Sequence, residues 1–107
     1  VNEAFAVQVL ALLDELGLPA DSPIVNPDGG AIAIGHPLAA SGVRLMVTLA
    51  RRFAADPSIR YGITTMCVGL GQGAAVVWEN PAHADYGSDA NLPATPTSNS
   101  TTAEVTS

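Results

Sequence analysis

The chain has 107 residues, 48% of them hydrophobic, and a formal net charge of −6. This length and composition allow one modest hydrophobic core and no more than one domain. The four basic residues are all arginines between Arg44 and Arg60, which excludes a cationic surface for nucleic acid. No apolar run approaches the roughly eighteen residues that cross a bilayer, so neither a membrane partner nor a signal peptide is predicted.

The single cysteine and the two ends of the chain bear on where the protein is located and on whether it is part of a longer protein. Cys67 has no partner for a disulfide within the chain, which predicts a reducing, cytoplasmic location. Residues 103–107 do not form a peroxisomal S-K-L address, which favours the same location. Because the chain opens at Val1 and leads straight into an Asn-Glu-Ala-Phe-Ala segment, we expect it to be part of a longer protein.

The first predicted element is a helix over residues 2–17, which Gly17 and Pro19 end in the usual order. Apolar residues recur along it at helical spacing: Phe5, Val9, Leu12 and Leu16. A second apolar row runs beside this one, so we expect the helix to be buried on most sides. Residues 24–26 predict a short strand or an extended approach to a glycine turn, and the segment 31–34 is too short to assign.

A second helix is predicted from residues 37–41 to residue 54 or 55. Its core face is predicted to consist of Val43, Met46, Val47, Ala50 and Ala54. Its opposite face is predicted to carry Ser41, Arg44, Thr48 and Arg51, with the arginines in solvent.

Two strands and a tail complete the chain. Segments 61–66 and 74–79 are rich in strand-forming residues, and the glycines between them predict an antiparallel hairpin with Cys67 at its mouth. From residue 81 onward Pro, Ser, Thr and acidic residues replace the large apolar ones, which predicts a disordered acidic tail over residues 81–107. His83 falls in that tail and is not expected to do chemistry.

Cys67 and His36 are the residues that could carry chemistry, and each has two interpretations. A lone cysteine is commonly a small core residue, but Val68-Gly69 directly after Cys67 forms a strand-to-turn break where a reactive thiol could be exposed. A lone histidine is often structural. Here the flanking Gly35 and Pro37 fix the backbone, which favours a positioned general base.

Asn2 and the glycines that follow Cys67 are the remaining candidates. Asn2 could be a helix N-cap, or it could orient a water or an oxyanion, and the sequence alone does not choose. The glycines of segment 69–73 follow a strand and lead into a strand, so the dinucleotide-loop interpretation fails. No spacing of metal ligands is present.

Three segments resemble the motifs of one family in the same order. They are Asn2-Glu3-Ala4-Phe5-Ala6, the Gly29–Gly42 segment with His36 in its Gly-His-Pro, and Cys67–Gly73. Over residues 1–80 the chain resembles the C-terminal portion of thiolases, the acyl-CoA:acetyl-CoA acyltransferases. The Asn-Pro-Asp before the first glycines and the Gln72-Gly73 pair look more like degradative thiolases, including the β-ketoadipyl-CoA type, than like the biosynthetic type.

The resemblance implies an α/β fold, layered α/β/α, with a mixed sheet that ends in an antiparallel hairpin. It divides the chain into a C-terminal thiolase domain, residues 1–80, and the tail of residues 81–107. It implies cleavage of 3-ketoacyl-CoA by coenzyme A to acetyl-CoA and a shortened acyl-CoA, or the reverse Claisen condensation. Coenzyme A is then a co-substrate, no cofactor is bound permanently, and the parent enzyme is a homodimer or homotetramer.

Residue by residue, the resemblance makes His36 the base that activates a nucleophilic cysteine elsewhere in the full enzyme. It makes Cys67 the acid and base at the α-carbon of the substrate. Asn2 would hold a water that forms one oxyanion hole with His36, and the Gly69 N–H would contribute to the other. Because the nucleophile and the loop domain that binds coenzyme A are outside these residues, the isolated chain is not expected to be a competent enzyme.

Three positions depart from the family pattern. Asp28 stands where the family often has Asn, and Ala39 and Leu70 stand where it often has Gly, which bears on substrate range more than on mechanism. Two alternatives are a non-catalytic thiolase-like protein that binds acyl-CoA or lipid, and an inactive truncated product. The joint presence of Asn2, His36 and Cys67 argues against the non-catalytic alternative.

Overall fold

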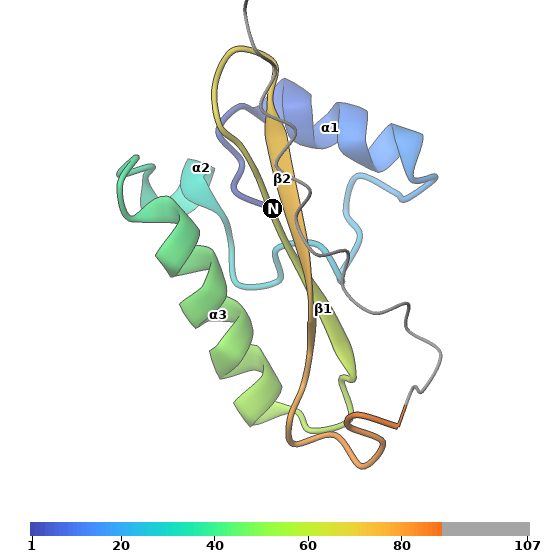
Figure 1. Cartoon of the computed structure of the whole chain (residues 1–107). Helices are drawn as coiled ribbons and strands as arrows, with labels where there is room; N and C mark the ends of the chain where they lie inside the picture. The colour runs from blue at the N-terminus through green and yellow to red at the C-terminus, as the bar shows by residue number, and fades with distance from the viewer. Residues whose placement is uncertain (89–107) are drawn as a thin grey trace, which may run out of the picture.

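The structure is a computed structural model that describes residues 1–88, and the remainder of the predicted tail, residues 89–107, lies outside the described residues. Three helices precede a two-stranded hairpin (Figure 1). The elements in chain order are α1 (Ala6–Glu15), α2 (Ala31–Ile34), α3 (Ser41–Ala55), β1 (Tyr61–Cys67) and β2 (Gly73–Glu79). None of the helices within residues 1–88 has the length and apolar character that crossing a bilayer demands.

The hairpin confirms the predicted pair of antiparallel strands. Its ladder runs without a break from Tyr61 opposite Glu79 to Cys67 opposite Gly73, which places Cys67 at the mouth of the connecting loop. Threonine, isoleucine and valine at its centre have the branched side chains that suit a pleated sheet. Residues 1–88 supply these two strands and no parallel pair, so the mixed part of the predicted sheet is not formed by them.

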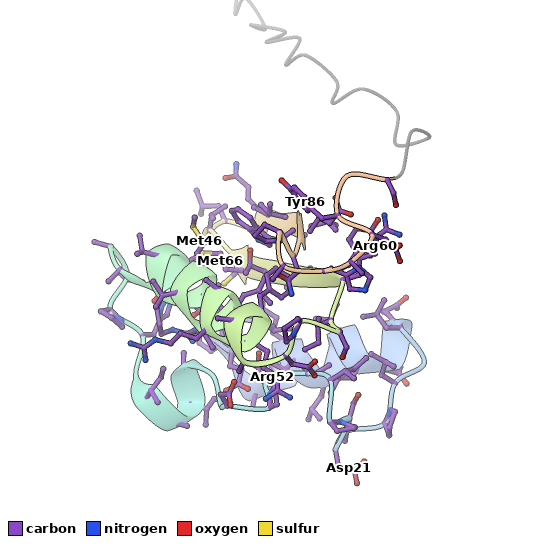
Figure 2. The ribbon with its side chains drawn as sticks, turned by 90° about the horizontal axis from the view of Figure 1, so that it is seen from below. Asp21, Met46, Arg52, Arg60, Met66 and Tyr86 are labelled. Carbon is purple, nitrogen blue, oxygen red and sulfur yellow. The ribbon has the colours of Figure 1, made fainter. Side chains whose placement is uncertain are left out.

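Helix α3 lies along the hairpin and packs on β1, as the view in Figure 2 shows. The position of Gly62 in β1 allows this approach, because a Cβ there would lie 2.4 Å from Leu49 Cδ1 and 3.0 Å from Phe53 Cζ. Near the other end of the helix, the Sδ of Met66 lies 3.7 Å from where a Cβ on Gly42 would be. The absent side chain at Gly62 therefore sets the distance between helix and sheet.

The predicted core face of α3 is wrong. The buried residues are Ser41, Leu45 and Phe53, spaced by multiples of four, and Ser41 has no exposed surface at all. The residues predicted to face the core are exposed: Val43, Met46, Val47, Ala50 and Ala54. Because α3 carries apolar residues on two faces, periodicity could not identify the face that the sheet covers.

The uncovered apolar face of α3 forms one side of an open groove. The groove has a volume of about 380 Å³, and Trp78 and Pro81 line its other side. Its surface is almost entirely apolar, with Glu79 the charged residue at its edge. The exposed apolar side chains thus form one continuous surface and are not scattered singly over the protein.

Helix α1 is shorter and more exposed than predicted. It begins at Ala6, since the backbone of the preceding residues bonds elsewhere, and Leu13 is its only buried residue. Its predicted end is confirmed: Gly17 has φ +64°, the Gly17 N–H donates to Asp14 O, and the Leu18 N–H donates to Leu13 O. This pair of bonds is a Schellman motif, which satisfies carbonyls that the last turn leaves open.

The segment between α1 and α3 is built from turns. Residues 24–26, predicted as a strand or an extended approach, belong to turns, and Asn26 has φ +46°. The unassigned segment 31–34 is the single-turn helix α2, which follows the Gly29-Gly30 turn. This part of the chain therefore owes its shape to hydrogen bonds rather than to a regular element.

The loop that joins β1 to β2 has a left-handed backbone over three consecutive residues. The φ angles are +87° at Gly69, +50° at Leu70 and +73° at Gly71. The Val68 N–H donates to Gln72 O and the Gln72 N–H donates to Gly69 O, which closes the loop. Leu70 is fully exposed at its tip. A positive φ is accessible to glycine without strain but is strained for leucine. Glycine would therefore suit position 70 better than the leucine that is there.

Residues 81–88, the first part of the predicted tail, form turns against the end of the hairpin. Arg60 donates to Glu79 Oε1 at 3.1 Å and to Ser88 Oγ at 3.2 Å. Asn80, which is 1% exposed, donates from Nδ2 to the carbonyls of Phe53 and Ile59 and accepts from the Ala82 N–H. Asn80 thus ties the end of β2 to the end of α3, and the domain boundary at residue 80 stays a prediction.

The close contact at Gly62 generates a stability prediction. Gly62→Ala should lower the free energy of unfolding by about 1–3 kcal/mol, because its Cβ overlaps Leu49 and forces α3 away from β1. Gly73→Ala, on the other strand, is the matched control: its nearest neighbour would be Met66 O at 3.7 Å, so its effect should stay within about 0.5 kcal/mol. Urea unfolding measures both, and an equal loss in the two variants would contradict the packing argument.

The strained loop tip generates a second prediction. Leu70→Asn should raise the free energy of unfolding by up to about 1 kcal/mol, because asparagine tolerates a positive φ better than leucine. Leu70→Val should lower it, because a β-branched residue is the least suited to this backbone. The side chain is fully exposed, so the series isolates the backbone effect. Thermal unfolding that ranked valine above asparagine would show that φ does not control the loop.

Candidate active site

Asn2 lies at the centre of a buried polar cluster and is 1% exposed. Its N–H donates to Thr65 O of β1 at 2.9 Å, and its C=O accepts from the Ala31 N–H of α2 at 2.9 Å. Its side-chain Nδ2 lies 3.3 Å from each ring nitrogen of His36. The structure therefore brings together two of the predicted site residues. Asn2 is not a helix N-cap, because α1 begins four residues later and is preceded by Phe5.

His36 is half-buried and has a second partner, Ser41. The Nδ1 of His36 lies 2.6 Å from Ser41 Oγ, and Ser41 Oγ donates to Pro37 O at 3.2 Å. Gly35, with φ +93°, turns the chain out of α2 so that the imidazole meets the first turn of α3. Ser41 was assigned to the solvent face of its helix, and its complete burial beside His36 corrects that prediction.

Arg44 is the second correction on this helix. It was predicted to point into solvent, yet it is only partly exposed, and its Nη2 donates to Asn2 Oδ1 at 3.0 Å. Its buried Nε has no hydrogen-bond partner in the described residues. The exposed arginines of α3 lie elsewhere: Arg52 is 3.9 Å from Asp28. Arg44 therefore points into the protein and bonds to Asn2, the residue that faces His36.

Hydrogen bonds of neighbouring side chains hold the segment around Asn2 in place. Glu3 has φ +61°, and its carboxylate accepts from Asn26 Nδ2 at 2.6 Å and from the Ile32 N–H at 3.4 Å. Gly30 makes room for it, since a Cβ there would lie 2.3 Å from Glu3 Cδ. Asn26 Oδ1 also accepts from the α-amino group of Val1 at 2.8 Å. Burial lowers the pKa of that amino group; the Glu3 carboxylate opposes this shift, and a nearby arginine adds to it.

Cys67 and Gly69 belong to a second cluster, at the mouth of the hairpin. Both line a shallow depression of about 470 Å³ whose other lining residues come from the start of α1 and the loop, among them Phe5, Gln8 and Gln72. Cys67 is half-buried and is a free thiol. Within residues 1–88 the Gly69 N–H has no hydrogen-bond acceptor, while its C=O accepts from Gln72. The Cys67 thiol and the Gly69 N–H thus both lie at the mouth of the hairpin.

One backbone bond connects the two clusters. Asn2 bonds to Thr65 of β1, and Cys67 follows two residues later on the same strand, roughly 7 Å further along. No hydrogen bond joins Cys67 directly to Asn2 or His36 in the described residues, and neither Asn2 nor His36 lines the depression. The structure therefore brings together Asn2 and His36, and separately Cys67 and Gly69, at neighbouring points of one strand end.

Sequence reasoning missed Ser41 and Arg44, for a physical reason. Arg44 is 42 residues from Asn2 in the chain, and helical periodicity assigns polar residues to the solvent side. One signal was available for Ser41: it lies in the same Gly29–Gly42 motif as His36. The described residues contain no group of His, Cys, Asp and Glu side chains that could hold a metal ion.

The family model for the thiolase C-terminal domain matches residues 1–80. The β-ketoadipyl-CoA thiolase of Pseudomonas putida is 54% identical over 79 residues, which are 74% of this chain and 20% of that protein. The Escherichia coli protein of the same name is 53% identical over 79 residues, with the same shares covered. The peroxisomal 3-ketoacyl-CoA thiolase B of Rattus norvegicus is 48% identical over 83 residues, 78% of this chain and 19% of that protein.

The chain thus spans about a fifth of the length of these relatives. No solved structure gives a significant match. The three motifs, their order and the match over residues 1–80 agree with one another and with the paired Asn2 and His36. The chain belongs to the thiolase family, whose C-terminal domain residues 1–80 match.

Proposed function

We propose that residues 1–80 supply the C-terminal part of the active site of an acyl-CoA acyltransferase. The reaction is cleavage of a 3-ketoacyl-CoA by coenzyme A to acetyl-CoA and a shortened acyl-CoA, or its reverse. The observation that carries the proposal is the buried pairing of Asn2 with His36, at 3.3 Å, beside the strand that ends in Cys67. The Asn2 amide and the Ser41 hydroxyl contact His36, and Arg44 holds the Asn2 amide in turn.

In the cleavage direction His36 takes the proton of a nucleophilic cysteine that the rest of the enzyme supplies. The thiolate attacks the 3-keto carbon, and the bond between C2 and C3 breaks with its electron pair going to the acetyl-CoA enolate. Cys67 then gives its proton to C2. A thiol at this position can give a proton in one direction of the reaction and take it in the other. Coenzyme A, whose thiol proton returns to Cys67, finally attacks the acyl-enzyme. The nucleophilic cysteine leaves and recovers its proton from His36, and the shortened acyl-CoA is released.

Charge develops on two oxygens in succession, and each needs donors that are in place beforehand. Asn2 Nδ2 and His36 form the donor pair for one, through a water that Asn2 holds. The Gly69 N–H, which has no acceptor within residues 1–88, is available for the other. Coenzyme A is a co-substrate, and no cofactor needs to be bound permanently.

The relatives suggest the finer assignment. Two of them are named β-ketoadipyl-CoA thiolase, so we propose a 3-oxo dicarboxylic acyl-CoA as substrate, in the degradative direction and in the cytoplasm. Because the chain spans a fifth of their length, the remainder of the thiolase chain is the partner that we expect to cover the apolar groove of α3. A homodimer or homotetramer is the assembly expected of the whole enzyme.

A chimera tests the proposal. Residues 1–80 replace the matching C-terminal segment of the Pseudomonas putida β-ketoadipyl-CoA thiolase, which supplies the missing four-fifths of the enzyme. The chimera should cleave β-ketoadipyl-CoA, whereas the chain of 107 residues alone should not. A soluble, folded chimera that binds acyl-CoA without turning it over would favour the non-catalytic alternative.

Two substitutions in the chimera separate the proposed roles. With a simple acyl-CoA, which can acylate the nucleophile without carbon–carbon chemistry, Cys67→Ser should still form acyl-enzyme by mass spectrometry. His36→Ala should form it about 10²–10⁴-fold more slowly, because the thiolate loses its base. Cys67→Ser should lose thiolysis of the 3-ketoacyl-CoA by a similar factor. Ser58→Ala, at a turn after α3, is the control; equal acylation in Cys67→Ser and His36→Ala would overturn the roles.

A further inference from the structure

Leu70, at the tip of the hairpin loop, combines a strained backbone with a fully exposed apolar side chain. Its φ is +50°, and no group within residues 1–88 covers the side chain. A single exposed leucine is ordinary on a protein surface. This one, however, is favoured neither by burial nor by its backbone conformation. Strained residues of this kind are concentrated at functional sites, so the side chain is a candidate for contact with a ligand.

The loop holds Leu70 beside two residues of the proposed active site. The Val68 N–H donates to Gln72 O and the Gln72 N–H donates to Gly69 O, so the loop is closed on the end of β1. Leu70 directly follows Gly69, with their Cα atoms roughly 3.8 Å apart. It also lines the same depression as Gly69 and Cys67. The leucine side chain therefore belongs to the surface that surrounds the thiol.

The lining of this depression suits an uncharged, partly apolar ligand. The loop lies near the start of α1 (Figure 1), and Phe5, just before that helix, is a second exposed apolar residue of the lining. Gln8 and Gln72 contribute carboxamides, and none of the lining residues is charged. Apolar walls with a few polar groups are typical of sites that bind small organic molecules. The methylene groups of an acyl chain meet this description.

In the proposed reaction Cys67 gives its proton to C2 of the substrate, and the Gly69 N–H meets an oxygen on a neighbouring carbon. The acyl chain begins at C4, only two bonds from C2, so its first methylenes lie beside the thiol and the loop. We infer that Leu70 is a specificity-determining residue whose isobutyl group contacts the acyl chain beyond C4. This inference rests on the proposed function and deepens it by naming the part of the substrate that the loop selects.

A contact of this kind discriminates between substrates by chain length. 3-Ketobutyryl-CoA ends at C4 and offers the isobutyl group no methylene. Substrates of six carbons offer it C5 and C6, whether or not they end in a carboxylate. The chemistry at C2 and the coenzyme A part are the same in all of them, so a difference between substrates isolates the contact with the chain.

The experiment compares kcat/KM of the chimera for 3-ketobutyryl-CoA, 3-ketohexanoyl-CoA and β-ketoadipyl-CoA. Leu70→Asn should lower kcat/KM about tenfold for both six-carbon substrates and less than about twofold for 3-ketobutyryl-CoA, because only the longer chains lose an apolar contact. Leu70→Met keeps a large apolar side chain and should keep the preference. Val68→Ala is the matched control, since Val68 is exposed in the same loop but does not line the depression. It should leave the ratio between substrates unchanged.

Thermal unfolding of the same variants separates this role from a structural one. Leu70→Asn should unfold at the same temperature as the unsubstituted chimera or at a higher one, because asparagine tolerates a positive φ. Its lower activity on six-carbon substrates then does not come from weaker folding. A residue that only shaped the loop would show the reverse, with activity on all three substrates following stability.

The outcomes distinguish this inference from the proposed function. An active chimera in which Leu70→Asn leaves the ratio between substrates unchanged would overturn the inference alone. An equal loss on all three substrates would also overturn it, because the side chain would then contact the coenzyme A part or shape the loop. A chimera that cleaves none of the substrates would remove the proposed function, and the inference with it.

Discussion

The burial of Asn2 is the constraint on which the rest of the structure depends. Its backbone pairs with β1 on one side and α2 on the other, and its side chain meets His36 and Arg44. Leaving one such buried group without its partner costs about 1–3 kcal/mol. Since three separate segments must supply these partners, the position of Asn2 fixes how the hairpin, the glycine turn and α3 meet. The most deeply buried side chains of the described residues are in fact polar: Asn2, Ser41 and Asn80.

Local signals in the sequence predicted the hairpin and the end of α1. The strands and their antiparallel pairing follow from β-branched residues on either side of a glycine loop, and the end of α1 follows from Gly17 in its Schellman motif. The buried face of α3 did not follow, because its apolar residues cover more than one face. Gly62, a residue of another element, selects the face by letting Leu49 and Phe53 approach β1. Information of that kind is not present in the helix itself.

The sequence alone identified the candidate site residues, but it did not identify the residues that hold them in place. His36 and Cys67 stand out by type and by their glycine-rich surroundings. Ser41 and Arg44 do not, because a serine and an arginine on an amphipathic helix are ordinarily solvent-facing. Their roles arise only when the first residues of the chain lie across β1, so that residues 42 positions apart share a hydrogen bond. Long-range polar contacts leave no periodic trace, which is why this part of the site needed the structure.

The direction of the hydrogen bonds explains why each position has the residue type it has. Asn2 combines an acceptor and a donor in one planar group, so it can accept from Arg44 and still donate to His36. An aspartate would accept from the guanidinium equally well but would offer the ring no donor. At the other end, the Ser41 hydroxyl can accept and donate at once, as a carbonyl or an ammonium group cannot. Residues from the start of the chain and from α3 thus hold one imidazole from two sides.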